Sequence, residues 1–284
     1  MSANLTKVTT GMIRRVEFRL VLGAVLIFAV SSIFAGEPVS NEAGLALAKA
    51  VYDRPNGDDF SALLVMQLQS KNGNPRQREL YSYGKEKGGG ERWSLMRFIK
   101  PDDVRETGLL TQDHPGDESD QWLYLPALKK VRRISSSRKG GRFVGSDFFY
   151  EDLLDREVEM DHHYLKGKGS VGKVPCDLLV SVPKDPENSV YSKRVSCVYS
   201  KILVPLVVEF YEKGRDKPSK KMTARRIKKI QGVWTVLEST MYDLETGHKT
   251  QLITRKIKYD QGLPDQLFSR RDLTDASFEK RFRP

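Results

Sequence analysis

The most constraining feature of this 284-residue sequence is a period-two alternation of side chains that continues, with few interruptions, to residue 259. Successive side chains of a β-strand point to opposite faces of a sheet, so this period is typical of strands. Turns rich in glycine separate the runs. Strand after strand joined in this way predicts a mainly β protein with one antiparallel, meandering sheet that curls toward a barrel. The predicted strands are residues 63–68, 79–83, 93–98, 121–125, 130–134, 157–166, 174–183, 189–199, 204–212, 219–230, 233–242 and 249–259.

Several of these runs are apolar on both faces of the sheet. In residues 121–125, Trp122 and Tyr124 share one face, whereas Leu123 and Leu125 share the other. One face can pack on helices of the chain itself. The other face then needs a ligand or a partner.

One helix is predicted ahead of the strands. Ser40 or Asn41 can cap it, apolar residues recur at helical spacing as far as Val51, and Pro55 stops it. Its apolar stripe predicts that the helix packs on the sheet.

The first 35 residues have the pattern of a signal peptide. Three arginines precede an apolar run over residues 20–30, and a small residue, Ala35, ends the segment. The apolar run is shorter than the roughly 20 residues that a membrane-spanning helix needs. We therefore expect cleavage near Ala35, export to the periplasm, and one mature domain over residues 36–284; an uncleaved anchor is the alternative.

The chain is basic, with a formal net charge of +11. Residues 1–35 hold four cations and one anion, so the mature chain keeps +8. Such a balance suits nucleic acid, an anionic membrane surface or anionic lipids. Export makes nucleic acid the weakest of these partners.

The two cysteines raise the question of a disulfide, because the periplasm is oxidising. Residues 174–183 and 189–199 read as a hairpin, and a symmetric turn at residues 184–188 would place Cys176 directly opposite Cys197. A one-residue bulge would break that register. The sequence thus leaves a disulfide and two separate buried thiols both open.

The densest motifs lie in residues 120–137 (DQWLYLPALKKVRRISSS) and 141–153 (GRFVGSDFFYEDL). With them the sequence resembles the outer-membrane lipoprotein-sorting (LolA-like) family, in the branch associated with RND-type exporters. Cys197 departs from the pattern, since relatives usually carry an aromatic residue there. The resemblance covers nearly the whole mature chain and extends to residues 97–105, 108–110, 208–211, 262–265 and 267–268.

This resemblance implies an incomplete, half-open β-barrel of about 11 strands covered by α-helices, as in LolA and LolB, with a cavity that binds acyl chains. The partners it implies are a lipid or lipoprotein acyl chain and an inner-membrane RND-type exporter. The mature protein is then expected to be soluble, with transient membrane contact.

Bulky apolar residues are the candidates for the cavity or its mouth. Residues 143–150 form an aromatic segment that could act as a flap hinged at Gly145, although ordinary core packing explains the same residues. Arg132 and Arg133 point to opposite faces and are candidates to contact an anionic head group or the exporter. The cavity candidates are Trp93, Leu95, Trp122, Tyr124, Phe143, Phe148 and Tyr150.

No motif points to catalysis, a metal or another cofactor. The sequence holds no Gly-x-Ser-x-Gly elbow, Walker loop or His-Glu-x-x-His. His162 and His163 follow one another on a strand and so cannot grip one ion. The adjacent carboxylates of Glu151 and Asp152 are expected to be solvated. An enzyme is therefore disfavoured.

Two functions remain. In the first, the protein carries a lipid or lipoprotein acyl chain between an inner-membrane exporter and the outer membrane. In the second, it is a non-catalytic periplasmic or surface adaptor that docks an acidic partner on basic strands such as residues 220–229.

Overall fold

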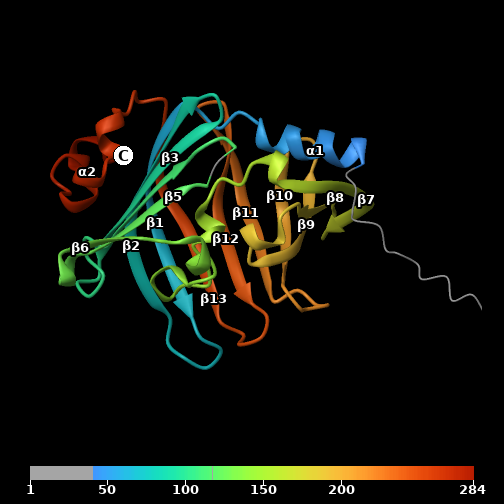
Figure 1. Ribbon diagram of the computed structural model, residues 1–284, viewed down its shortest axis with the longest axis horizontal. Coiled ribbons are helices and arrows are strands. Elements are labelled where there is room, and N and C mark those ends of the chain that lie inside the picture. Colours follow the sequence, from blue (N-terminus) through green and yellow to red (C-terminus); the bar gives the residue numbers. More distant parts are fainter. Residues whose placement is uncertain (1–40, 117) are drawn as a thin grey trace, which may run out of the picture. The chain divides into compact units, whose positions relative to one another are not determined.

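A single antiparallel sheet of thirteen strands organises the chain in the computed structural model (Figure 1). The structure describes residues 41–116 and 118–284, which lie in one compact unit, Pro38–Pro284. The predicted signal peptide lies outside the described residues. The strands are β1 (Asp59–Gln69), β2 (Arg76–Gly88), β3 (Glu91–Lys100), β4 (Gly108–Asp113), β5 (Asp120–Leu125), β6 (Lys130–Arg133), β7 (Asp161–Val171), β8 (Val174–Pro183), β9 (Tyr191–Tyr199), β10 (Val204–Glu212), β11 (Lys220–Ile230), β12 (Val233–Asp243) and β13 (Lys249–Tyr259).

The strand order leaves the sheet unclosed. It reads β6-β5-β4-β3-β2-β1-β13-β12-β11-β10-β9-β8-β7, so β6 and β7 are the two edges and β1 pairs with β13 in the middle. The predicted mainly β, half-open architecture is confirmed, with thirteen strands in place of about 11. The sequence prediction missed β4 and began β7 four residues too early.

Tight turns fix the registers of the hairpins. Between β11 and β12, Ile230 pairs with Val233 across the two residues Gln231 and Gly232, both of which have positive φ. This is the backbone of a type I′ turn, whose twist matches that of the flanking strands.

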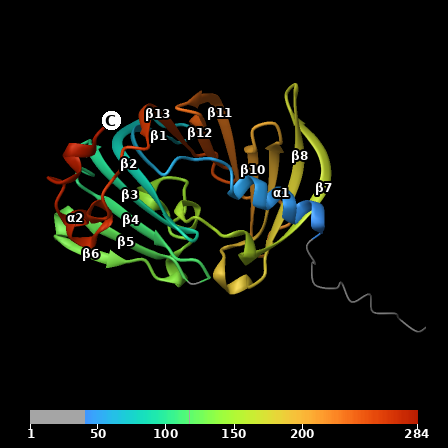
Figure 2. The same ribbon diagram turned by 90° about the horizontal axis from the view of Figure 1, so that it is seen from above.

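Helix α1 (Glu42–Tyr52) packs on the strands near the β7 edge (Figure 2). The Asn41 side chain caps it by accepting from the Gly44 N–H at 2.7 Å, and it also accepts from the Leu165 N–H of β7. A Cβ on Gly44 would lie 2.5 Å from the Tyr164 Cα, so only glycine allows this close approach. No helix of residues 41–116 and 118–284 is both long and apolar enough to cross a bilayer.

The C-terminal segment covers the outer face of β2–β5, defined here as the face that carries Tyr83, Leu95 and Leu110. This segment contains η7 (Asp265–Phe268), α2 (Arg270–Thr274) and η8 (Glu279–Phe282). Leu267, Phe268 and Leu273 are buried against that face.

A buried ion pair fastens this segment to the sheet. Arg97 Nε donates to Glu279 Oε2 at 2.6 Å, and both side chains are about 1 % exposed. The guanidinium also donates to the carbonyls of Glu106 and Asp272. All three contacts satisfy a charge that would be costly to bury alone.

A disulfide joins β8 and β9 through Cys176 and Cys197, whose Cα atoms are 5.3 Å apart. The predicted register is wrong, because Cys197 lies opposite Leu178 and not opposite Cys176. The turn is asymmetric: Pro186–Asn188 forms a 3-10 turn, η6, which adds residues after β8. The bridge therefore links diagonal neighbours.

Removing Glu279 should loosen the C-terminal segment. Glu279→Ala leaves the Arg97 charge buried without a carboxylate, and we expect the free energy of unfolding to fall by about 3–5 kcal/mol in urea denaturation. The control is Glu245→Ala, which removes the exposed pair with Arg215 and should cost less than about 1 kcal/mol. Equal losses for both variants would contradict the anchoring role.

Candidate functional site

The inner face of the sheet, which carries Leu64, Leu80 and Phe98, is covered by α1 and by residues 135–160 between β6 and β7 (Figure 2). Within that segment, Phe143, Phe148 and Tyr150 are buried in the clusters that cover this face. The ring centroid of Phe143 lies 5.6 Å from that of Phe98. The three aromatic residues of the predicted flap thus pack as core.

Buried carboxylates anchor this segment, contrary to the expectation that they are solvated. Glu151 accepts from the Val190 N–H at 2.7 Å and from the Ser189 hydroxyl. Asp152 accepts from the Lys220 ammonium at 2.6 Å and from the Tyr191 hydroxyl at 2.7 Å. The prediction failed because each acid meets donors from strands far along the chain.

Lys220 also departs from the expectation for the basic strand. Its side chain is about 4 % exposed, and its ammonium lies 3.5 Å from the Phe149 ring centroid. Burial lowers the pKa of Lys220, although Asp152 opposes that shift. Lys220 therefore belongs to the interior, whereas Arg225, Arg226, Lys228 and Lys229 of the same strand are exposed.

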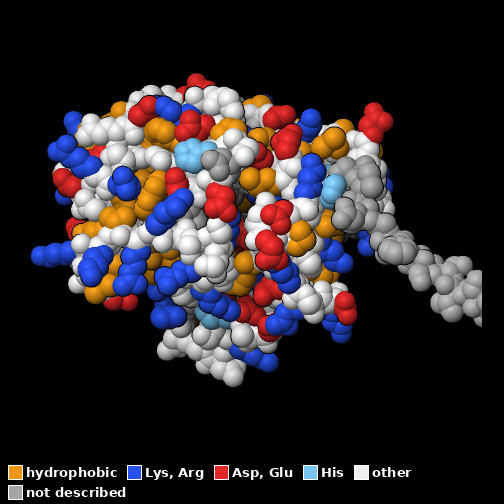
Figure 3. Space-filling view, in the orientation of Figure 1, with side chains coloured by type: hydrophobic (Ala, Val, Ile, Leu, Met, Phe, Trp, Pro, Cys, Tyr) orange, Lys and Arg blue, Asp and Glu red, His pale blue; other side chains and the backbone are white. Residues whose placement is uncertain are grey.

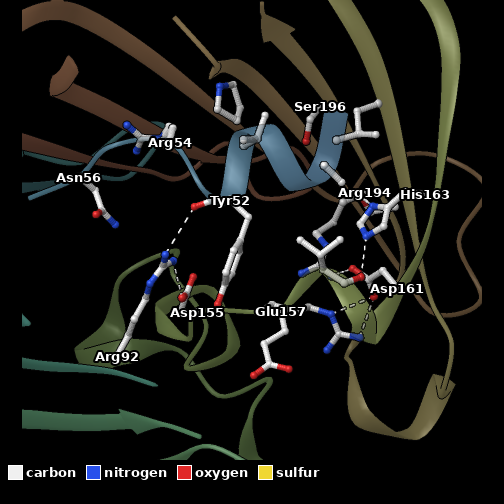
Figure 4. A pocket seen from close by; sticks show the side chains of 17 residues that line it. Tyr52, Arg54, Asn56, Arg92, Asp155, Glu157, Asp161, His163, Arg194 and Ser196 are labelled. Carbon is white, nitrogen blue, oxygen red and sulfur yellow. Dashed lines mark hydrogen bonds and ion pairs between the residues drawn. The ribbon is translucent and has the colours of Figure 1, made fainter. Parts of the chain in front are cut away.

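Two adjoining cavities remain on the inner side. Cavity A, of about 340 Å³, lies beneath α1 (Figure 4). Cavity B, of about 400 Å³, lies between the loop after α1, strands β2–β3 and residues 152–155. The apolar lining is Ala48, Val51, Val158, Leu179 and Pro205 in cavity A, and Phe60, Met96, Leu153 and Leu154 among others in cavity B.

The apolar wall of the inner face extends beyond these two linings without being fully covered. Leu64, Met96 and Leu252 point to the inner side yet are only partly buried, as is Met222 of β11. The segment of residues 135–160 therefore fills the inner side incompletely.

Cavity A is lined at one end by Asp161 with two arginines (Figure 4). Arg156 donates to Asp161 Oδ1 at 2.8 Å, and Arg194 donates to Asp161 Oδ2 at 2.5 Å. Burial alone would raise the pKa of Asp161, but the two guanidinium groups outweigh it and hold that pKa below its ordinary value. The Asp161 carboxylate therefore forms ion pairs with two arginines.

His163 lies beside this group and is buried. Its Nε2 is 2.8 Å from the Val158 carbonyl, to which it donates, and its Nδ1 is 3.0 Å from the Ser181 hydroxyl. Burial lowers the pKa of His163, so the ring is neutral near pH 7.

Four side chains line both cavities: Arg54, Asn56, Arg92 and Asp155. Arg92 forms ion pairs with Asp155 at 2.6 Å and with Glu86 at 2.7 Å. Asn56 donates to Glu86 at 3.0 Å. The junction between the cavities is therefore polar, with apolar walls on either side.

The remaining cavity candidates belong to the other side of the sheet, although Trp93 is also among the residues that line cavity B. Trp93, Leu95, Trp122 and Tyr124 pack on the outer face with the C-terminal segment, and the Trp93 and Phe268 ring centroids are 6.3 Å apart. They do not come together with Phe143, Phe148 and Tyr150. Strand alternation alone could not tell which apolar face the C-terminal segment would cover.

The two candidate arginines lie on the edge strand β6. Arg133 pairs with Asp120 at 2.6 Å on the outer face, and Arg132 lies opposite Leu123. Both are exposed, and neither lines cavity A or cavity B.

Sequence reasoning missed the charged lining of the cavities. The sequence patterns gave no reason to place Arg54 or Asp161 in a cavity. A signal was present for Arg156 and Arg194: each is a charged residue within or beside a stretch that must become buried, which requires a partner.

Comparison with solved structures identifies the fold. The sheet matches that of a LolA superfamily protein from Nitrosomonas europaea with a TM-score of 0.62 at 19 % identity, over 82 % of this chain and 99 % of that one. The fold is therefore that of the LolA superfamily.

Closer relatives show the family. The chain is 32 % identical to a domain from Vibrio parahaemolyticus described as an outer membrane lipoprotein-sorting protein, with a TM-score of 0.78, over 82 % of this chain and 99 % of that one. It is also 32 % identical to a DUF1329 family protein from Desulfovibrio piger, with a TM-score of 0.77, over 83 % and 99 %. A family model with the description "-like: Uncharacterized protein" matches residues 90–275. None of the curated proteins compared with the chain matches it. The chain belongs to this family of LolA-like, outer membrane lipoprotein-sorting proteins.

Asp113 gives the site a pH dependence. It lines cavity B, its Oδ2 accepts from the Asp155 N–H at 3.2 Å, and its buried Oδ1 has no hydrogen-bond partner among the described residues. Burial raises the pKa of Asp113 from 3.8 to about 6. The folded protein thus holds this proton more tightly than the unfolded chain, and the ionised form costs stability.

We expect Asp113→Asn to remove that cost. Relative to the variant, the wild type should lose stability as pH rises from about 4 to about 6 and show a constant deficit of about 1–3 kcal/mol above that. Urea denaturation across this pH range measures the difference. The exposed Asp102→Asn serves as the control, and a pH-independent difference for Asp113→Asn would contradict the assignment.

Proposed function

We propose that the protein is a periplasmic, non-catalytic carrier whose inner side shelters an acyl chain of a lipid or lipoprotein. The observation that supports this most is the pair of adjoining cavities beside a partly uncovered apolar wall. Their volumes fall within the range of small-molecule sites, roughly 300–1,000 Å³. Family membership supports the same reading.

The binding energy would come from burial of hydrocarbon. Each methylene that leaves water gains about 0.8 kcal/mol, so ten methylenes contribute about 8 kcal/mol before ordering costs are subtracted. Release requires a partner that favours an open state of the cover. Helix α1 and residues 152–158 are the parts of the cover that line cavities A and B.

The cellular setting of the proposal is the periplasm, with residues 36–284 as one mature domain. The leader-like residues 1–35 and the disulfide between Cys176 and Cys197 both fit an oxidising, exported location. The resemblance of the motifs in residues 97–153 to the branch associated with RND-type exporters supports such an exporter as the partner.

A variant that fills cavity B tests the proposal. Ser94 is partly buried on the inner face of β3 and lines this cavity. Ser94→Trp should weaken binding of a pyrene-labelled monoacylglycerol about tenfold or more, because two or three methylenes lose their place at about 0.8 kcal/mol each. Fluorescence titration measures the affinity.

Ser170→Trp, on an exposed position of β7, is the matched control and should bind the probe like the wild type. If the wild type fails to bind the probe, or if Ser94→Trp binds it as tightly while remaining folded, the proposed carriage is wrong.

A second candidate function is the docking of an acidic partner on the edge strand β6. Exposed cations gather there, and basic side chains are concentrated at the lower left of Figure 3, over this part of the molecule. Among the residues that the structure describes, a carboxylate lies within ion-pair distance of Arg133 alone of these cations. Such docking would weaken steeply with salt and would not respond to Ser94→Trp. The exposed cations are Lys129, Lys130, Arg132, Arg133 and Arg138.

A further inference from the structure

Arg54 is a cation at the junction of the two cavities and has no counterion among the described residues. It lies two residues after the end of α1 and lines cavity A (Figure 4) as well as cavity B. No carboxylate of the described residues forms an ion pair with it, and its single hydrogen bond is from Nη1 to the Trp234 carbonyl at 3.2 Å. A guanidinium has five N–H donors, so most of its donors have no protein acceptor.

The neighbouring arginine shows the contrast. Arg92 lines the same two cavities but is neutralised by Asp155 and Glu86. Burial lowers the pKa of Arg54, and no carboxylate appears among the groups that shift it, whereas Asp155 and Glu86 help to raise the pKa of Arg92. Arg54 is therefore partly desolvated without compensation, which is costly unless a ligand supplies the anion.

The far end of cavity A adds to this positive character. Arg156 and Arg194 share the single carboxylate of Asp161. The remaining acid of the lining, Glu157, accepts from the Gly116 N–H at 3.1 Å. The lining of cavity A holds four arginines against three carboxylates, whereas that of cavity B holds three cations against six carboxylates. An anion is therefore favoured electrostatically on the cavity A side of Arg54.

We propose that Arg54 binds the oxyanion head group of an amphiphile, a carboxylate or a phosphate, whose hydrocarbon chain occupies the apolar parts of the cavities. This inference rests on the proposed function and specifies its ligand class. Guanidinium groups bind carboxylates and phosphates through paired, charge-assisted hydrogen bonds. The apolar residues Phe60, Met96 and Leu153 on one side, and Val51 and Leu179 on the other, flank the position of the head group.

The test compares ligands that share one chain and differ in the head group. Lauric acid, lauryl phosphate and lauryl alcohol compete at neutral pH with the pyrene-labelled monoacylglycerol for the wild type, Arg54→Gln, Arg54→Lys and the control Arg225→Gln, an exposed position on β11. We expect the wild type and the control to bind the two anions about tenfold more tightly than the alcohol. Arg54→Gln should lose this preference, and Arg54→Lys should retain part of it.

Each other outcome has a defined meaning. A preference for only one of the two anions supports the inference and identifies the head group as carboxylate or phosphate. Equal binding of acid, phosphate and alcohol by the wild type, or an unchanged preference in folded Arg54→Gln, overturns the inference while the proposed carriage stands. Inorganic phosphate that competes as strongly as lauryl phosphate also overturns it, because the site would then take the free ion. Failure of the wild type to bind the probe or any lauryl ligand overturns the proposed function as well.

Discussion

The structure depends on one constraint: much of the sheet is apolar on both faces, so both must be covered. On the outer face of β2–β5 the C-terminal segment meets this need with Leu267, Phe268 and Leu273. On the inner face the cover is the segment between β6 and β7, with α1 beside it. The outer cover packs closely, whereas the inner cover leaves two cavities, and this difference sets the candidate site on the inner side.

Buried charges hold both covers in place. Arg97 and Glu279 join the C-terminal segment to β3, and Glu151 and Asp152 join the inner segment to β9 and β11. These acids are matched by donors within the protein, so they add specificity of position more than they add stability. Arg54 differs from them because, within the described part of the chain, no carboxylate pairs with it at the place where the inner cover is incomplete.

The sequence predicted the fold better than it predicted the site. Period-two alternation located twelve of the thirteen strands, but β4 was missed because it is a short run next to an acidic loop. The hairpin of Cys176 and Cys197 was recognised, although the extra turn at Pro186–Asn188 shifted its register. Local sequence patterns thus predicted where the strands lie, whereas the exact register between paired strands depended on turn geometry.

The site residues were harder to predict from the sequence, because their positions depend on contacts between segments that are far apart in the chain. Trp93 and Trp122 were correctly read as bulky residues on apolar faces, yet which face was hollow depended on where residues 262–284 pack. Glu151 and Asp152 look solvated in the sequence and become buried only because Ser189, Tyr191 and Lys220 converge on them. No local sequence pattern reveals that these residues lie close together in the folded protein.

The central claim is that hydrocarbon enters the inner side of the sheet and not the outer side. Methyl NMR spectra recorded with a spin-labelled fatty acid test it directly. The account predicts that the methyl signals of Met96 and Leu153, which line cavity B, broaden. The signals of Leu267 and Leu273, which the C-terminal segment buries against the outer face, stay sharp. Broadening confined to Leu267 and Leu273, or no broadening at any of the four, would contradict it.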